Sequence, residues 1–372
     1  AADMVVHRSI VDLIGETPMV EVSELSPNPA VRIVAKLESQ NPAGSVKDRI
    51  ARAMIAEAEA DGTLTPGRTI IEPSSGNTGI ALAMIARLKG YPIKIVLPEN
   101  VSIERRQILE AEADGTLTPG RTIIEPSSGN TGIALAMIAR LRGYPIKIVL
   151  PENVSIERRQ LLEIFGAEII LSPGGEGSNG AVKKAQGLAE EHPEWAFLYQ
   201  YANEANPRAH YETTGPEILR DVPDITHFAA GLGTSGTLLG VGTYLKEQNP
   251  DIEIHAIQPP VGLTVEGLRN LEEGYIPPVY EKWGGDSLLS GNRLVGPRES
   301  IEWTRRLSSE LGVFCGISGG AAVAGAAKLA ERVDRAVIVV VLADGGWKYL
   351  STGAWTDPLD DVVERAERII YF

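Results

Sequence analysis

The sequence predicts an α/β protein with two three-layer αβα domains, each built on a mostly parallel sheet. Short apolar segments alternate with amphipathic helical segments along most of the chain, which is typical of repeated strand–helix units. The apolar segments are continuous and rich in β-branched residues, which indicates strands buried on both faces of a parallel sheet. With 372 residues, the chain is long enough for two domains with large cores.

The expected elements follow one another in a regular order. Residues 19–25 and 31–39 are two short early segments that predict a small hairpin. Downstream, apolar runs bounded by turn residues predict further strands, and the amphipathic segments between them predict helices. These strands are expected at 69–73, 92–98, 168–173, 226–233, 252–259 and 336–344, and helices at 80–90, at 155–166 and from about Thr237.

One segment of 53 residues is present twice, because residues 57–109 match residues 110–162 at a constant offset. The two differences are Lys89 against Arg142 and Ile108 against Leu161. Solenoid proteins need at least three repeats, which drift in sequence, so we interpret the repeat as a recent or engineered segmental duplication. Each copy contains a strand–helix–strand–helix pattern. The smaller domain is therefore expected to be enlarged by a duplicated βαβα segment.

The composition narrows the class of protein. Hydrophobic residues make up 43% and charged residues 23% of the chain, which is typical of a soluble globular protein. The net charge of −14 argues against nucleic acid as a partner, because a phosphate backbone requires a basic face. A single cysteine, Cys315, excludes an intramolecular disulfide and favours a reducing compartment. The N-terminal residues lack a signal-peptide pattern and the longest apolar run, 336–343, is too short to span a bilayer, so a cytoplasmic protein without a membrane partner is expected.

The first motif that carries chemistry is NPAGSVKDR at residues 41–49, in which Lys47 follows a turn and begins a predicted helix. A lone lysine at such a position is best interpreted as a solvated residue of a helix-capping loop. The surrounding turn, however, resembles the pyridoxal-phosphate lysine motif of the cysteine synthase and cystathionine β-synthase family, the fold-type-II enzymes. The resemblance implies the fold-type-II architecture, pyridoxal 5'-phosphate as the cofactor, and Lys47 as the catalytic residue that forms a Schiff base with it.

Two glycine-rich turns further along the chain extend the resemblance. GLGTSGT at 231–237 lies between a predicted strand and a predicted helix, where backbone N–H groups can bind an anion. GISGGAA at 316–322 also begins a helix, although each turn by itself is common in α/β proteins. The resemblance implies that Ser318 lies at the pyridine nitrogen of the cofactor, where a hydroxyl favours β-elimination and β-replacement over transamination. It also implies a phosphate site formed by Gly233, Thr234, Ser235, Gly236 and Thr237.

The turn SSGNT begins a predicted helix in each copy of the duplication and offers N–H and hydroxyl groups to a carboxylate. The resemblance implies that this turn and Gln200 bind the α-carboxylate of the substrate, and that the Asn of the turn contacts the 3'-oxygen of the cofactor. The first copy keeps the spacing to Lys47, whereas the second keeps the spacing to Gln200. Both copies therefore remain open, and the first is preferred because it follows the Lys47 helix directly. The residues concerned are Ser74, Ser75, Gly76, Asn77 and Thr78, or Ser127, Ser128, Gly129, Asn130 and Thr131.

The motifs cover essentially the whole chain and are similar to the O-phosphoserine sulfhydrylase branch of the family, of the actinobacterial type. Arg269, in EGLRN at 266–270, matches the arginine that binds the phosphate of O-phosphoserine in that branch, and a guanidinium group suits a phosphate dianion. The segment from Ala343 to the C-terminus also resembles this branch. The resemblance implies a tail that covers the active site, a homodimer, and a small thiocarboxylated carrier protein as the sulfur donor.

The expected activity is therefore synthesis of L-cysteine from O-phospho-L-serine and either sulfide or carrier-bound sulfur. An O-acetylserine sulfhydrylase and a dehydratase of the same fold are alternatives. A third is a catalytically impaired binding protein, whose pocket the duplication has damaged. Residues 1–44 and 206–372 are expected to form a larger cofactor-binding domain, and residues 45–205 a smaller, mobile substrate-binding domain that closes over the substrate. No metal site is expected.

Overall fold

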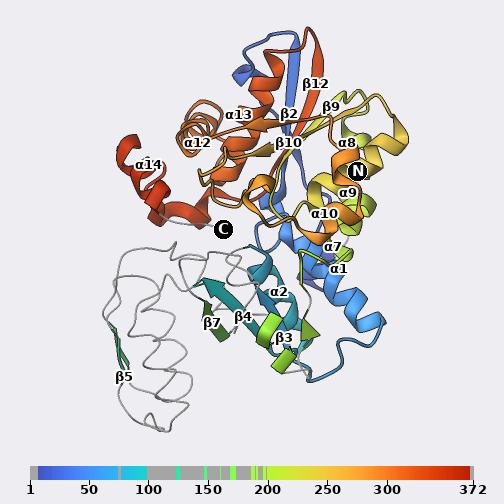
Figure 1. The fold of residues 1–372 in the computed structure, drawn as a ribbon, viewed down its shortest axis with the longest axis vertical. Coiled ribbons are helices and arrows are strands. Elements are labelled where there is room, and N and C mark those ends of the chain that lie inside the picture. Colours follow the sequence, from blue (N-terminus) through green and yellow to red (C-terminus); the bar gives the residue numbers. More distant parts are fainter. Residues whose placement is uncertain are drawn as a thin grey trace.

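The computed structural model describes most of the chain outside the second copy of the duplication. The described residues are 7–73, 77–98, 123–125, 146–148, 160, 168–172, 186–188, 190–191, 196–197 and 199–368. Within them the chain forms a six-stranded sheet, a four-stranded sheet and a separate two-stranded sheet. Figure 1 shows the six-stranded sheet and its helices above the four-stranded sheet, with α1 and α7 between them.

The six-stranded sheet has the order β1-β2-β12-β9-β10-β11. All neighbouring strands are parallel except β1 and β2, which form the antiparallel pair expected from the first two segments. Its edge strand β11 was not predicted from the sequence, because it is short, has two adjacent polar residues in its middle and has no β-branched residue. The strands are β1 (Met19–Glu21), β2 (Val31–Leu37), β9 (His227–Gly231), β10 (Glu253–Gln258), β11 (Gly291–Leu294) and β12 (Ala336–Leu342).

Helices cover both faces of this sheet and give it two cores. Along β12, Ile338 and Val340 pack in the core that contains α12 and α13, whereas Val339 and Val341 pack in the core that contains α8 and α9. Alternate side chains of a strand point to opposite faces, which explains why the run is continuously apolar. The helices are α7 (Ala205–Ala209), α8 (Gly215–Asp221), α9 (Gly236–Gln248), α10 (Pro278–Lys282), α11 (Gly285–Leu288), α12 (Pro297–Leu311), α13 (Ile317–Ala330) and α14 (Leu359–Arg368), with the π-helix η5 (His210–Thr214). Short 3-10 helices are η1 (Ile10–Leu13), η2 (Ser23–Leu25), η3 (Glu38–Gln40), η6 (Leu271–Glu273) and η7 (Gly346–Thr352).

The four-stranded sheet is fully parallel and has the order β7-β4-β3-β8. Helices α1 and α2 pack beside it around a third core that includes Met54, Ile55 and Ile80. The elements are α1 (Lys47–Ala60), β3 (Ile70–Pro73), α2 (Asn77–Lys89), β4 (Ile93–Pro98), β7 (Glu168–Ser172) and β8 (Ala196–Phe197). All of its strands come from residues 45–205, and those of the six-stranded sheet come from 1–44 and 206–372; the boundary between two domains stays a prediction.

The two copies of the duplicated segment have different strand partners. Strands β3 and β4 of the first copy pair with β8 and β7, which follow the second copy in the chain. Strands β5 (Ile123–Glu125) and β6 (Ile146–Ile148) of the second copy pair in parallel with each other. Figure 1 shows β5 well away from β4 and β7. Among the described strands, the second copy therefore adds none to the four-stranded sheet.

The described residues include no helix that is both long and apolar enough to cross a membrane.

Candidate active site

Lys47 lies at the carboxyl end of the central strand β12. Val46 donates a backbone hydrogen bond of 2.8 Å to the carbonyl of Ala343, and Ser45 forms an isolated β-bridge with Asp344. The backbone N–H of Lys47 donates to Ser45 Oγ over 3.2 Å. The turn that the sequence singled out is thus attached to the residues that leave β12. In parallel α/β sheets, ligands bind at this end of the strands.

The environment of Lys47 changes the acidity of its ammonium group. Burial lowers the pKa of Lys47 to about 8, and the negative charge of Asp344 partly opposes this effect. A lysine of ordinary pKa is almost entirely protonated near neutral pH, whereas about a tenth of this one is neutral at pH 7. The neutral amine is the form that attacks a carbonyl carbon or accepts a proton.

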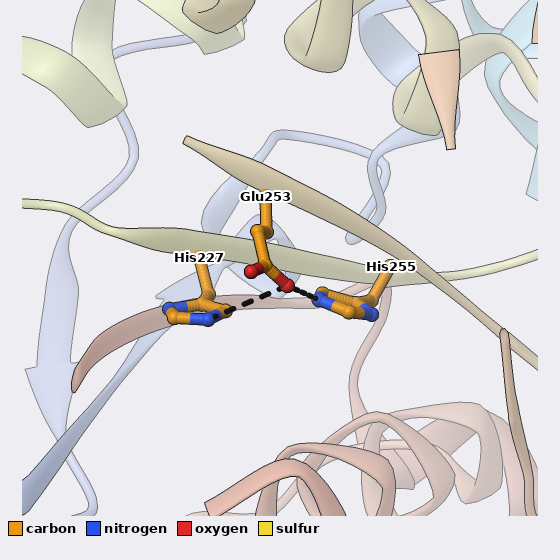
Figure 2. Close-up of side chains that lie close together, drawn as sticks. All are labelled: His227, Glu253 and His255. Carbon is orange, nitrogen blue, oxygen red and sulfur yellow. Dashed lines mark hydrogen bonds and ion pairs between the residues drawn. The ribbon is translucent and has the colours of Figure 1, made fainter. Parts of the chain in front are cut away.

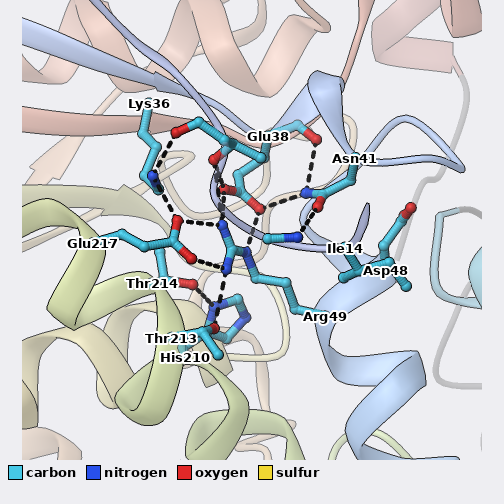
Figure 3. A network of polar contacts seen from close by, with 12 residues as sticks. Ile14, Lys36, Glu38, Asn41, Asp48, Arg49, His210, Thr213, Thr214 and Glu217 are labelled. Carbon is cyan, nitrogen blue, oxygen red and sulfur yellow. Dashed lines mark hydrogen bonds and ion pairs between the residues drawn. The ribbon is translucent and has the colours of Figure 1, made fainter. Parts of the chain in front are cut away.

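A buried ionic network fixes the helix that Lys47 begins. Figure 3 shows the Arg49 guanidinium between the carboxylates of Glu38 and Glu217. Arg49 donates two hydrogen bonds of 2.8 Å to each of them, and Lys36 forms a further ion pair of 2.8 Å with Glu217. All four side chains are at most 4% exposed. The first turn of α1 is thereby tied to η3 and to α8.

His210 lies between this network and the glycine-rich turn at 231–237. Its Nδ1 is 2.9 Å from Thr214 Oγ1, and its Nε2 is 3.2 Å from Thr237 Oγ1. Burial, followed by the charges of Arg49 and Lys47, holds the pKa of His210 well below its ordinary value. His210 is therefore a neutral imidazole that positions Thr237. No sequence pattern pointed to it, because a single buried histidine carries no periodic signal.

The glycine-rich turn at 231–237 has the features of an anion site. Ser235 adopts a left-handed backbone conformation (φ 74°) immediately before α9, and its buried Oγ has no hydrogen-bond partner. A side chain at Gly236 would lie 1.9 Å from Asn206 Oδ1, so only glycine fits there. Asn206 also donates a 2.9 Å hydrogen bond to Thr234 Oγ1. A phosphate group at the N-terminus of α9 would satisfy the Ser235 hydroxyl and the free N–H groups of the helix, so these residues fit the expected cofactor.

Ser318 lies in the first turn of α13, next to the same strand end as Lys47. Gly316, which precedes the helix, donates a 3.1 Å backbone hydrogen bond to the carbonyl of Asp344. The Ser318 hydroxyl lies close to the loop that carries Gly267 and Arg269. A Cβ atom built on Gly267 would be 3.9 Å from Ser318 Oγ. Burial raises the pKa of the neighbouring Cys315 thiol to about 12, so this thiol is not a reactive nucleophile.

Gln200 connects the first copy of the duplication with the glycine-rich turn at 231–237. Thr78, in the first turn of α2, donates a buried 2.6 Å hydrogen bond to Gln200 Oε1. Asn206 donates a 2.9 Å hydrogen bond to the backbone carbonyl of Gln200 as well as to Thr234. The described residues exclude Ser74, Ser75, Gly76, Ser127, Ser128, Gly129, Asn130 and Thr131 and the side chain of Asn77.

Arg269 packs against two aromatic rings beside the glycine-rich turn at 231–237. Its backbone N–H donates a 2.8 Å hydrogen bond to the carbonyl of Leu232. Its guanidinium carbon is 4.9 Å from the ring centre of Tyr201 and 5.0 Å from that of Tyr275. Arg269 is only 8% exposed, and a side-chain hydrogen bond joins it to Tyr201. A buried cation with aromatic neighbours can bind an anion strongly.

Glu72 is a buried carboxyl group that the sequence patterns did not single out. It lies on β3 and accepts a 3.3 Å hydrogen bond from the backbone N–H of Gln200. Burial raises the pKa of Glu72 to about 8, although hydrogen bonds from Gln200 and Tyr199 oppose the shift. At neutral pH it is therefore mostly protonated. It fixes the segment in which Tyr199 has a left-handed backbone (φ 50°).

Comparison with known proteins identifies the family. A sequence profile of the family described as pyridoxal-phosphate dependent enzyme matches residues 10–113 and again residues 107–344. Cysteine synthase B of Pseudomonas aeruginosa is 36% identical over 353 residues, which cover 95% of this chain and 98% of that protein. The chain belongs to the pyridoxal-phosphate-dependent enzymes.

Solved structures agree with this assignment to the pyridoxal-phosphate-dependent enzymes. A crystal structure of O-ureido-L-serine synthase superposes with a TM-score of 0.74 at 33% identity, over 94% of this chain and 96% of that one. An O-acetylserine-dependent cystathionine β-synthase from Helicobacter pylori has a TM-score of 0.72 at 30% identity, over 95% of this chain and 100% of that one. The predicted fold-type-II architecture, the cofactor and the assignment as an enzyme of the transferase class are confirmed.

Proposed function

We propose that this enzyme makes L-cysteine from O-phospho-L-serine by β-replacement. The observation that carries the proposal is the Arg269 guanidinium, which is buried and contacts the rings of Tyr201 and Tyr275. It lies beside the glycine-rich turn at 231–237, the proposed phosphate turn. Similarity to proteins named cysteine synthase supports the reaction class. It does not distinguish between a phosphate and an acetate leaving group, so that choice depends on Arg269.

Arg269 suits a phosphate better than an acetate ester. A guanidinium group can donate two parallel hydrogen bonds to a phosphate dianion, whereas an acetyl group offers one weak carbonyl acceptor and no charge. Tyr201 and Tyr275 pack against the guanidinium group, which is largely buried. The hydroxyl groups of Tyr199 and Tyr275 form a 2.7 Å hydrogen bond, which helps to hold the Tyr275 ring beside Arg269. Such a rigid, desolvated cation strengthens its interaction with an anion.

Lys47 would move the proton of the reaction. Pyridoxal phosphate, when bound, supplies the electron sink that acidifies the Cα–H bond of the substrate and lets the Cβ substituent leave. Lys47 Nζ, with a pKa of about 8, removes this proton and later returns it to Cα. Ser318 would hydrogen-bond the pyridine nitrogen without protonating it, which favours β-replacement. Ser235, Thr234 and the N-terminus of α9 would hold the cofactor phosphate.

We infer that the first copy of the duplication forms the substrate-binding turn. The buried hydrogen bond between Thr78 and Gln200 supports this choice. Strands β3 and β4 of the first copy also belong to the sheet that contains β7 and β8. The turn 74–78 and Gln200 would then hold the α-carboxylate of the substrate together. The sulfur donor, sulfide or a thiocarboxylated carrier protein, and the assembly as a homodimer are parts of the same proposal.

O-acetylserine as the substrate is the second candidate, and the Helicobacter pylori structure described as O-acetylserine dependent supports it. The test compares kcat/KM for O-phosphoserine and O-acetylserine, with sulfide, in the wild type, Arg269→Ala and the exposed control Arg208→Ala. Loss of a charge-assisted contact worth 1.5–3 kcal/mol lowers kcat/KM by about 10- to 150-fold. We expect this loss for O-phosphoserine alone and only in Arg269→Ala.

Other outcomes separate the remaining possibilities. Equal losses for both substrates in Arg269→Ala would contradict the phosphate role. A higher kcat/KM for O-acetylserine than for O-phosphoserine in the wild type would favour O-acetylserine as the substrate. Pyruvate production that does not depend on added sulfide would identify a dehydratase. Absence of the visible band of lysine-bound cofactor, together with no turnover of either substrate, would support the impaired binding protein.

A further inference from the structure

Three side chains of metal-binding type converge at the amino ends of β9 and β10. His227 begins β9, Glu253 begins β10, and His255 follows two residues later. His227 and Glu253 are register partners in adjacent parallel strands, so all three side chains lie on the same face of the sheet. Figure 2 shows both imidazole rings directed toward the Glu253 carboxylate.

The distances between the three groups suit a tetrahedral metal. Glu253 Oε2 is 2.8 Å from His255 Nε2 and 3.6 Å from His227 Nε2. One ligand atom from each residue lies within 4.8 Å of the other two. Zinc bonds to nitrogen and oxygen of about 2.0–2.2 Å place tetrahedral ligand atoms about 3.3 Å apart. Small rotations of the side chains would therefore bring all three atoms to a common metal.

The hydrogen bonds around His227 leave its Nε2 available. Thr226 Oγ1 accepts a 2.9 Å hydrogen bond from Val337 N, donates over 3.1 Å to Val337 O, and lies 2.7 Å from His227 Nδ1. All three contacts are satisfied together when Nδ1–H donates to the hydroxyl. In that tautomer, Nε2 carries the lone pair. A second residue that fixes the orientation and tautomer of a histidine in this way is common in metal sites.

Two of the three side chains, the histidines, are buried, whereas Glu253 is exposed. His227 is 8% exposed and His255 is 1% exposed. His227 Nε2 is buried and has no hydrogen-bond partner, which is costly unless a ligand is present. Burial lowers the pKa of both histidines, and the neutral imidazole is the form that binds metals.

We propose that His227 Nε2, His255 Nε2 and Glu253 Oε2 form a binding site for one divalent transition metal ion, with zinc as the best fit. Two imidazoles and one carboxylate are a known three-ligand set for zinc and leave a fourth position for water. The site joins the amino ends of β9 and β10, whereas the phosphate turn follows the carboxyl end of β9. The metal would stabilise the six-stranded sheet and take no part in the reaction at Lys47.

The charged groups around the site define a second test. The Glu253 carboxylate favours a cation, whereas the positive charge of Arg293 acts on both histidines. Arg332 acts on Arg293 in turn. Arg293 does not belong to the ligand set, so its removal should strengthen metal binding without changing the ligands.

The experiment uses untagged holoenzyme freed of metal with a chelator and then titrated with zinc in a calorimeter. We expect one zinc ion per chain in the wild type and in His7→Gln, an exposed histidine outside the cluster. His227→Gln and His255→Gln should bind at least about tenfold more weakly, and Arg293→Gln more tightly. Zinc should raise the thermal midpoint of the wild type, because a ligand that binds only the folded state stabilises it.

Three outcomes would overturn the proposed metal site. Saturable binding of one zinc ion that is unchanged in the His227→Gln/His255→Gln double variant would place the metal elsewhere. No saturable binding to the wild type would also overturn it. Far-UV circular dichroism and the visible cofactor band identify a variant that has misfolded, and Arg293→Gln then provides the decisive comparison. Unchanged or weaker zinc binding in Arg293→Gln would contradict the proposal.

Discussion

Replacement of Arg49 by Met should strongly destabilise the enzyme. Arg49 is 1% exposed and is the shared partner of Glu38 and Glu217. Burial alone would raise the pKa of Glu217, but the hydrogen bonds and charges of Arg49 and then of Lys36 outweigh it and lower the pKa to about 2. Relative to the ordinary value of 4.5, this shift corresponds to about 3 kcal/mol. Removal of one partner of a buried ion pair generally costs a similar amount, about 3–5 kcal/mol, because it leaves the other charge buried and unpaired.

The assay is urea unfolding followed by far-UV circular dichroism, at neutral pH and again in acid. The folded-state pKa of Glu217 lies below its unfolded value, so the stability it contributes is present above about pH 4.5 and is lost as the pH falls toward 2. The deficit of Arg49→Met should therefore shrink over that interval. The matched control is Arg208→Met, which breaks an exposed ion pair with Glu57 and should cost less than about 1 kcal/mol.

Two results would refute this reasoning about Arg49. One is a loss of less than about 1 kcal/mol at neutral pH, which would mean that the two carboxylates find other partners or water. The other is a loss that is the same at neutral pH and near pH 3, because the ionised Glu217 would then not be its cause. A double-mutant cycle with Glu217→Gln measures the coupling directly, and we expect it to exceed about 1 kcal/mol.

Four further predictions follow from the site. Burial raises the pKa of Glu72 to about 8, so the free energy of unfolding should fall as the pH rises from about 4.5 to 8, by at most about 5 kcal/mol. Urea unfolding of Glu72→Gln should not show this decline. Thr78→Val should raise KM for the amino-acid substrate about tenfold through loss of its hydrogen bond to Gln200, whereas Thr131→Val, the same change in the other copy, should not; the reverse result would place the second copy in the site. Deletion of residues 110–162 leaves a single copy before Glu163 and should keep the cofactor band and kcat/KM, because the site needs one such turn; a complete loss of activity would show that both copies are required. Ser235→Ala should weaken pyridoxal-phosphate binding in equilibrium dialysis by about tenfold, and unchanged binding would show that this hydroxyl does not contact the phosphate.

The candidate site residues that the sequence could single out depend on short segments of chain. The predictions for the Lys47 turn, the glycine-rich turn at 231–237 and the start of α13 at Ser318 each rest on local rules, because glycines and a helix N-terminus act within a few residues. The main parallel strands could be predicted for a similar reason. A buried β-branched run such as 336–342 is visible without knowledge of its partners.

Other features arise from contacts between distant segments. Arg49 is an ordinary helix residue in the sequence, and only packing brings it to Glu217, which lies 168 positions away. His210, Asn206 and the tyrosines around Arg269 act through similar long-range contacts. Side chains of this kind have no pattern along the chain, because their partners come from other elements of the fold.

The duplicated segment shows most clearly the difference between what local sequence patterns predict and what contacts between distant segments decide. The sequence by itself determined the family-type motifs, the order of strands and helices, and the existence of two nearly identical copies. It could not choose between the copies, because identical residues have identical local preferences. The tertiary structure assigns β3 and β4 of the first copy to the sheet of β7 and β8, and β5 and β6 of the second copy to each other. Strand pairing between distant segments decides this, because the edges of β7 and β8 can each accept only one neighbouring strand on a given side.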